Sequence, residues 1–362
     1  MTALAIRSLR ATAVEVPMKH VLGTSAAAVR AAPLLLIDLE TEEGIAGRSY
    51  LFCYLRGAAS AMAAMVAEVE RRVRGERTPP AELWEKLAKG LRLIGVQGIV
   101  RMAMAGFDVA YWDAMARAAG KPLVEFLGGK RREIRAYNSN GLGLMGVDAL
   151  AKEADELLEG GFRGVKLRLG YATLEEDIAA VKTVKARLPN GIELMVDYNQ
   201  ALPVDEALRR GHALDEFGLA WIEEPIRHDD YRGAARLARE LSTPIQIGEN
   251  FSQPQALEEA IASKACDLVM PDLERIGGVT GWMRAAQIAR DAGMKMSSHL
   301  FPEVSAHLLA VTPTCDWLEF VDWAAPLMKE PVKIVAGDAQ VPDRPGNGMD
   351  WDPAAVERFR LQ

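Results

Sequence analysis

Short apolar runs recur about every 25 residues from Ile134 onward, and this period constrains the fold more than any other feature of the chain. Between successive runs lies a segment with the periodicity of an amphipathic helix. Eight strands that alternate with helices predict a (β/α) barrel rather than an open sheet, whose first turn would be rich in glycine. The runs cover residues 134–139, 164–169, 192–198, 219–224, 244–249, 267–272, 294–299 and 316–321.

The chain before the first run is organised differently. Two apolar runs around Glu42-Glu43-Gly44 predict a β-hairpin, and helical patterns follow at 58–75 and 99–122. The last stretch is rich in Pro, Gly and Asp and does not resemble another strand–helix unit. We therefore expect an α+β domain over residues 1–130, a barrel over 131–321, and a segment over 322–362 that packs back on the first domain.

Composition excludes several classes of partner. The net charge is −7 and basic residues form no block, so we expect no nucleic-acid partner. No window approaches about 18 consecutive apolar residues, so we expect no membrane span. The cysteines Cys53, Cys266 and Cys315 show no CxxC spacing, which is typical of reduced thiols in a cytoplasmic protein.

Three acids end successive predicted strands. Asp197, Glu223 and Glu249 occur in "VDYNQ", "WIEEP" and "IGEN" and follow one another at a spacing of 26 residues. One strand–helix unit separates each acid from the next, so their carboxylates converge at the end of a barrel where active sites lie. A single such acid could be a helix cap or a solvated charge. Three in register predict a cation site, and an all-oxygen ligand set favours Mg²⁺.

The neighbouring strands carry the other candidate residues. Lys166 and Arg168, in "GVKLRLGY", lie two residues apart on one predicted strand and so share a face, which we expect to turn toward the acids. Asp272 and His299 end adjacent strands, so the carboxylate can accept the imidazole N–H and raise its basicity. The eighth run adds Glu319. A lone histidine is often a hydrogen-bonded core residue, but the strand-end position of His299 favours catalysis.

Together these motifs resemble the mandelate racemase branch of the enolase superfamily over essentially the whole chain. The resemblance rests on "VKLRLG", "VDYNQ", "WIEEP", "IGEN", "MPDLERIGGVTGW", "SSHLFPEVSAHLLA" and "WLEF". It implies an α/β fold, a modified (β/α)7β TIM-type barrel with an α+β capping domain, and a homo-oligomer, with an octamer as one state. It also implies Mg²⁺-dependent removal of the α-proton of a 2-hydroxycarboxylate by way of an enediolate.

The resemblance further implies a role for each candidate residue. These roles are Mg²⁺ ligation by Asp197, Glu223 and Glu249, proton abstraction by His299 with Asp272, carboxylate binding and enediolate stabilisation by Lys166 and Glu319, and lining of the site by Asn199 and Ser139.

Arg168 departs from the family pattern, because mandelate racemases have a second lysine base at this position. Deprotonating a free arginine at pH 7 costs roughly 8 kcal/mol, so Arg168 is a poor base and a good clamp for a carboxylate or hydroxyl. One-base chemistry favours an acid-sugar dehydratase, with a mandelate-type racemase or epimerase as the alternative. A non-catalytic barrel that binds an acid ligand is the alternative from another class, and the intact set of acids argues against it.

Substrate specificity is expected in the first domain. Residues 19–33 resemble a lid loop, and the segment 50–56 offers Tyr54 for contact with the substrate. The predicted lid is mixed in character. Its Val21 and Leu22 suit an aromatic or lightly hydroxylated acid, whereas Lys19, His20 and Arg30 suit a polyhydroxy acid. The sequence therefore leaves open which small-molecule 2-hydroxycarboxylate is the substrate.

Overall fold

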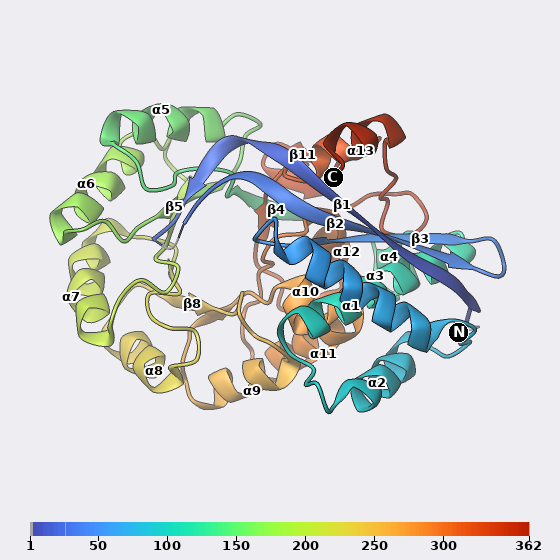
Figure 1. The fold of residues 1–362 in the computed structure, drawn as a ribbon. Coiled ribbons are helices and arrows are strands. Elements are labelled where there is room, and N and C mark those ends of the chain that lie inside the picture. Colours follow the sequence, from blue (N-terminus) through green and yellow to red (C-terminus); the bar gives the residue numbers. More distant parts are fainter. Residues whose placement is uncertain (1–2, 26, 362) are drawn as a thin grey trace.

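The computed structural model describes residues 3–25 and 27–361. Its first part is a three-stranded antiparallel sheet followed by helices (Figure 1). The predicted hairpin at Glu42–Gly44 joins the second and third strands, and Gly44 has a φ of 77°, which glycine adopts without strain. The elements are β1 (Ile6–Gly23), β2 (Ala28–Thr41), β3 (Ala46–Phe52), α1 (Ala58–Val73), α2 (Pro80–Leu91), α3 (Gly98–Ala118) and α4 (Leu123–Phe126).

Parallel strands form the second part, and helices on the outside separate successive strands (Figure 1). The last strand pairs with the first, which closes the barrel. The strands are β4 (Glu133–Asn138), β5 (Gly164–Arg168), β6 (Glu193–Asp197), β7 (Ile222–Glu223), β8 (Ile245–Ile247), β9 (Leu268–Val269) and β10 (Leu318–Phe320). The helices are α5 (Val147–Leu157), α6 (Leu174–Lys185), α7 (Val204–Leu214), the short η1 (Asp215–Phe217), α8 (Tyr231–Glu240), α9 (Pro254–Ala262), α10 (Leu273–Ile276), α11 (Gly278–Asp291) and α12 (Pro302–Val311).

The predicted barrel and capping domain are therefore confirmed, with one difference in the seventh strand. Within the part of the chain that the structure describes, residues 294–299 form only isolated bridges, at Met296 and His299. The hydroxyls of Ser297 and Ser298 accept the backbone N–H groups of residues 317 and 319 at 3.3 and 3.1 Å. Because side chains replace carbonyls as acceptors, the ladder is interrupted, and the prediction of a regular strand here is wrong.

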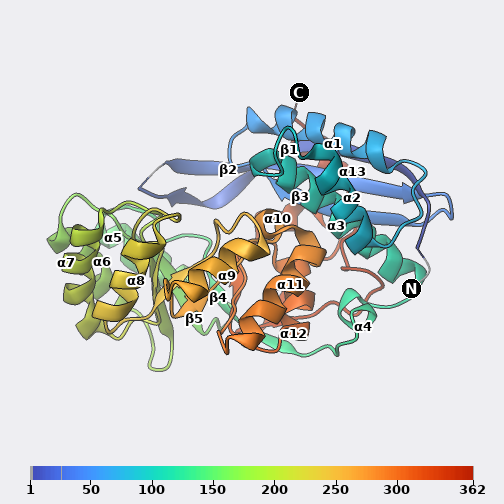
Figure 2. The same ribbon diagram turned by 90° about the horizontal axis from the view of Figure 1, so that it is seen from below.

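The predicted lid loop is the end of a long β-hairpin. β1 and β2 pair up to Gly23 and Ala28, with an irregularity between residues 17 and 22, and the hairpin reaches across one end of the barrel (Figure 2). Leu144 donates its N–H to the Gly23 carbonyl at 2.9 Å, and the Ser25 hydroxyl donates to the Tyr198 carbonyl at 3.1 Å. Residues 19–33 are therefore mostly strand rather than loop, with Ala26 outside the described residues, and their role as a lid remains a prediction.

The C-terminal segment contacts both parts of the molecule. It contains η2 (Ala325–Leu327), β11 (Lys333–Val335), β12 (Asp338–Gln340) and α13 (Pro353–Phe359). β12 pairs antiparallel with β4 of the barrel, whereas Trp351 donates its indole N–H to Asp38 of β2 at 3.1 Å. The division into 1–130, 131–321 and 322–362 remains our proposal.

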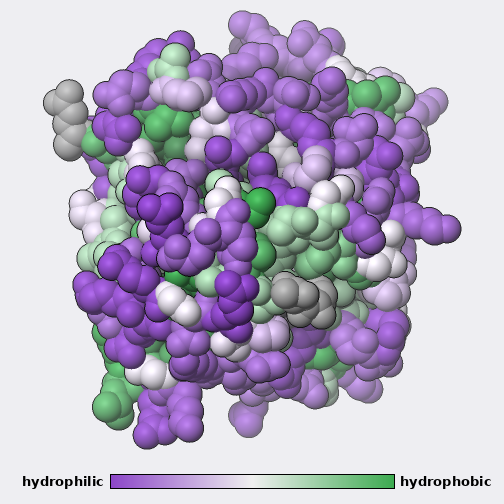
Figure 3. All heavy atoms as spheres, turned by 90° about the vertical axis from the view of Figure 1, so that its right-hand side faces the viewer, coloured by the Kyte–Doolittle hydropathy of each residue, from purple (hydrophilic) through white to green (hydrophobic). Residues whose placement is uncertain are grey.

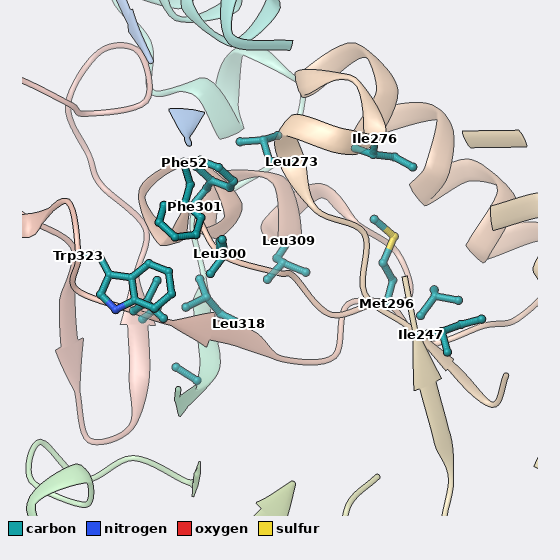
Figure 4. Packing of buried hydrophobic residues seen from close by; sticks show 14 of the residues in the cluster. Phe52, Ile247, Leu273, Ile276, Met296, Leu300, Phe301, Leu309, Leu318 and Trp323 are labelled. Atoms are coloured by element: carbon teal, nitrogen blue, oxygen red, sulfur yellow. The ribbon is translucent and has the colours of Figure 1, made fainter. Parts of the chain in front are cut away.

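The capping domain packs on the barrel through an apolar contact. α3 is buried from Val100 to Ala116 and lies between the sheet and the helices α10 and α11. Phe52 of the cap packs against Trp323 of the C-terminal segment with ring centroids 5.1 Å apart (Figure 4). Within the described ranges, no helix has the length and apolar character that a membrane crossing needs, and the face in Figure 3 is mostly hydrophilic.

Candidate active site

Three carboxylates converge at the ends of adjacent strands. Asp197 and Glu223 are the last residues of β6 and β7, and Glu249 follows β8 by two residues. One oxygen from each lies within 4.8 Å of the others. Asp197 and Glu223 are buried and Glu249 is half-buried, so their mutual repulsion is poorly screened.

Lys166 supplies positive charge to this cluster. Its side chain leaves the inner face of β5, and its Nζ lies 2.6 Å from Glu223, 2.8 Å from Glu319 and 3.5 Å from Asp197. Burial acts to lower the pKa of Lys166, but the three carboxylates outweigh it and hold the pKa above its usual range. In this arrangement Lys166 therefore stays protonated and keeps its positive charge.

One lysine does not balance the acids, and the residues present fit a divalent cation. Burial and the neighbouring carboxylates raise the pKa of Glu223 to about 8 despite Lys166. The buried Oδ1 of Asn199 has no hydrogen-bond partner among the described residues, while Asn199 donates its side-chain amide to Asp197 at 3.0 Å. A dense oxygen-only cluster of this kind is what Mg²⁺ prefers.

His299 is oriented by Asp272, as the sequence suggests. Asp272 caps α10, and its Oδ1 accepts the backbone N–H groups of Glu274 and Arg275 at 2.8 and 3.0 Å. Its other oxygen accepts the Nδ1–H of His299 at 2.7 Å. The Nε2 atom is thereby left to face the acids, 3.5 Å from Glu249.

As long as no cation neutralises the neighbouring carboxylates, the surroundings of His299 favour its protonated form. Burial acts to lower its pKa, whereas the carboxylates of Glu249, Glu319 and Asp272 raise it to about 9. Glu319 lies between the two basic groups, 2.8 Å from Lys166 Nζ and 3.9 Å from His299 Nε2. Burial acts to raise the pKa of Glu319, but these cations hold it well below its usual range.

Arg168 lies further from the acids than Lys166. Its Nε is 3.8 Å from Asp197 and has no hydrogen-bond partner among the described residues. Its Nη1 donates to the carbonyls of Ser139 and Gly141 at 3.4 and 3.5 Å. Ser139 therefore contacts Arg168 through its backbone, whereas its buried hydroxyl has no partner in the described part of the chain.

Tyr54 lies beside residues that the sequence analysis did not single out. It has a φ of 58°, and the guanidinium of Arg275 stands 4.6 Å from its ring. Arg275 donates to the side-chain oxygen of Asn250, and Asn250 donates to both Glu224 and Glu249. Asn250 and Arg275 directly follow the motifs "IGE" and "DLE", so adjacency to these motifs was the available signal.

Comparison with known proteins identifies the same family over both domains. The family model described as "Mandelate racemase / muconate lactonizing enzyme, N-terminal domain" matches residues 6–128, and the "Enolase C-terminal domain-like" model matches residues 149–355. L-talarate/galactarate dehydratase of Salmonella typhimurium is 32% identical over 318 residues, which are 87% of this chain and 80% of that protein.

Solved structures match nearly the whole chain. An enolase from alpha proteobacterium bal199 with bound magnesium is 43% identical, with a TM-score of 0.97 over 99% of this chain and 100% of that one. An enolase from Bradyrhizobium in complex with magnesium and mandelic acid is 40% identical, with a TM-score of 0.95 over 100% of both chains.

Proposed function

The chain belongs to the mandelate racemase and muconate lactonizing enzyme family of the enolase superfamily, and we propose that it removes the α-proton of a 2-hydroxycarboxylate with His299 as the base. One observation carries this proposal. Lys166 and the His299 of the Asp272–His299 pair approach different oxygens of Glu319, and each basic group lies within 4 Å of that carboxylate. A substrate carboxylate between them would meet positive charge on one side and a base on the other.

Mg²⁺ is the cofactor that these acids fit, and Asp197, Glu223 and Glu249 would hold it. When bound, it would supply positive charge beside the substrate carboxylate, which favours loss of the adjacent proton. Lys166 would hold the same carboxylate by its fixed charge. Glu319, anchored by the Leu300 N–H at 2.9 Å, would bind a protonated oxygen of the activated substrate.

His299 would take the proton at Nε2, because Asp272 occupies Nδ1. In a dehydration, the electron pair of the broken C–H bond forms a C=C bond as the β C–O bond breaks. The departing hydroxide takes the proton from His299 and leaves as water, and the enol becomes a 2-keto-3-deoxy acid. This scheme needs one base only, which agrees with an arginine at position 168.

Racemisation remains the second candidate, because the Bradyrhizobium protein that resembles this chain was crystallised with mandelic acid. A racemase would return the proton to the opposite face of the same carbon. Homo-oligomerisation and a cytoplasmic location stay predictions.

A screen of acid sugars and aryl 2-hydroxyacids with added Mg²⁺ tests the proposal. Formation of a 2-keto acid, followed as its semicarbazone, identifies dehydration, and a change in circular dichroism without a keto product identifies racemisation. His299→Asn is the matched control and should lose either activity. Equal turnover by parent and His299→Asn proteins would contradict the assignment of the base.

A further inference from the structure

A buried carboxylate on the outer helix α6 joins the ends of two strands that carry active-site residues (Figure 1). This carboxylate belongs to Asp177, and its Oδ1 accepts the backbone N–H groups of Gly170 and Tyr171, which follow β5, at 3.0 Å each. Its Oδ2 accepts the hydroxyl of Tyr198, which directly follows Asp197 of β6, at 3.0 Å. We propose that Asp177 is a positioning residue that acts through Tyr198 and holds Asp197 in place for the metal.

The charge of Asp177 is balanced by the buried Arg210 of α7, whose Nη1 lies 2.6 Å from the Oδ2 of Asp177. Arg210 also donates to the Tyr171 carbonyl at 3.0 Å and to Glu206 at 2.6 Å. A buried ion pair adds little net stability compared with apolar side chains that fill the same space, because both charges lose their hydration. It does, however, require each polar atom to meet its partner at a fixed place. The pair therefore suits a positioning role better than a purely stabilising one.

The turn that Tyr198 anchors has a strained backbone. Asn199 and Gln200 have positive φ angles, 46° and 65°, which cost free energy in residues other than glycine. This conformation folds Asn199 back on Asp197, to whose carboxylate it donates its backbone N–H at 2.7 Å and its side-chain amide at 3.0 Å. On the other side of the turn, Gln200 donates its N–H to the Glu224 carbonyl at 2.8 Å. Strain of this kind persists only where the surroundings fix the backbone, so loss of the Tyr198 anchor should free Asn199 from the Asp197 carboxylate.

The orientation of Asp197 should determine how tightly the metal binds. This inference rests on the proposed function, because it takes Asp197 as a metal ligand. Removal of a group that orients a metal ligand by a hydrogen bond typically weakens metal binding about 10- to 100-fold. Tyr198 is one contact further from the metal than Asn199, so we expect a smaller loss when its hydroxyl is removed, of at least about threefold.

Calorimetric titration of Tyr198→Phe with Mg²⁺ tests the proposal. The change removes one hydroxyl and keeps the buried ring, so the packing around it is retained. The matched control is Tyr111→Phe in α3 of the cap, where a similarly buried tyrosine donates its hydroxyl to the Leu4 carbonyl at 2.8 Å. We expect both variants to unfold at lower urea concentrations than the parent in the presence of EDTA. Only Tyr198→Phe should bind Mg²⁺ more weakly.

A double-mutant cycle tests whether the Tyr198 hydroxyl acts through Asp177. Asp177→Asn keeps the size of the side chain and removes its charge, and it should weaken Mg²⁺ binding at least as much as Tyr198→Phe. In the Asp177→Asn background, Tyr198→Phe should cause little further loss of affinity, and full additivity of the two changes would contradict the role of Asp177. If Asp177→Asn does not fold, the comparison of Tyr198→Phe with Tyr111→Phe still decides the proposal.

Unchanged Mg²⁺ affinity in Tyr198→Phe, or an equal loss of affinity in Tyr111→Phe, would overturn the proposal. Glu223→Gln separates this failure from failure of the proposed function. If Glu223→Gln loses Mg²⁺ binding while Tyr198→Phe binds as the parent does, the metal site stands and the positioning role fails. If Glu223→Gln binds Mg²⁺ as tightly as the parent, the metal assignment fails and the positioning role fails with it.

Discussion

Replacing Arg168 by lysine should give the active site a second base. The two free side chains differ by about 2 to 3 pKa units, so a lysine would be neutral roughly 100 to 1,000 times more often at the same pH. The site already admits a lysine on this strand, since Lys166 extends from β5 to within 2.6 Å of Glu223. The rate of α-proton exchange from the face opposite His299 should therefore rise by up to roughly 100 to 1,000 times.

The assay is solvent exchange in D₂O, followed by ¹H NMR on each α-epimer of a substrate that the enzyme turns over. The parent protein should exchange only the epimer whose proton faces His299, and Arg168→Lys should begin to exchange the other. Arg168→Met is the control, because it removes the charge without adding a base. It should raise KM and lower kcat/KM about 10- to 100-fold, the value of a charged hydrogen bond, without opening the second face.

Comparable exchange of both epimers by the parent would show that a base already exists opposite His299. The preference for dehydration would then give way to racemisation. Equal exchange of the second epimer by Arg168→Lys and Arg168→Met would show instead that residue 168 cannot reach the α-carbon.

Three further predictions concern the metal, the cap and the lid. Glu223→Gln should weaken Mg²⁺ binding and abolish turnover, and unchanged affinity by calorimetry would refute the metal assignment. Burial raises the pKa of Asp108 to about 7, so the folded state keeps a proton that the unfolded state loses above pH 3.8. The free energy of unfolding should therefore fall as pH rises from about 4 to 7, by at most about 4 kcal/mol, and Asp108→Asn should flatten the profile in urea titrations with EDTA. Gly143→Ala would bring a Cβ to 2.4 Å from the Gly23 nitrogen, so it should displace the hairpin tip and raise KM, with unchanged kinetics as the contrary result.

The barrel and the convergence of three strand-end acids were predictable because both follow from period and spacing. Carboxylates at the ends of successive parallel strands must share one edge, so the 26-residue spacing of Asp197, Glu223 and Glu249 was enough to bring them together. The Asp272–His299 contact follows from the same rule. The roles of these residues in catalysis remain predictions.

Other features could not be predicted, because they depend on contacts between segments distant in sequence. Nothing local shows that the hydroxyls of Ser297 and Ser298 take the backbone donors of the eighth strand. Arg101 occurs in a helix that looks uniformly apolar, and its contacts with the ring of Trp84 and the amide of Gln253 appear only when that helix is packed on its neighbours. Local pattern predicts elements, whereas the pairing of charges depends on packing.

The loop over residues 139–145 shows how the lid and the second cation are joined. Leu142 accepts the backbone N–H of Arg168 with its carbonyl at 2.9 Å and donates its own N–H to Glu153. The other oxygen of Glu153 bonds the Nδ1 of His20 in the hairpin at 2.9 Å. His20 is thus engaged in holding the hairpin to the barrel.

These contacts change what the lid residues indicate about the substrate. Of the polar residues that suited a polyhydroxy acid, His20 is bonded to Glu153, whereas Lys19 and Arg30 are exposed. Leu22, which suited an aromatic or lightly hydroxylated acid, is buried. The lid therefore gives no support to a polyhydroxylated substrate, and among the residues of this chain the preference for dehydration rests on Arg168. Exchange at the two faces of the α-carbon, rather than the character of the lid, is consequently the measurement that decides between the two reactions.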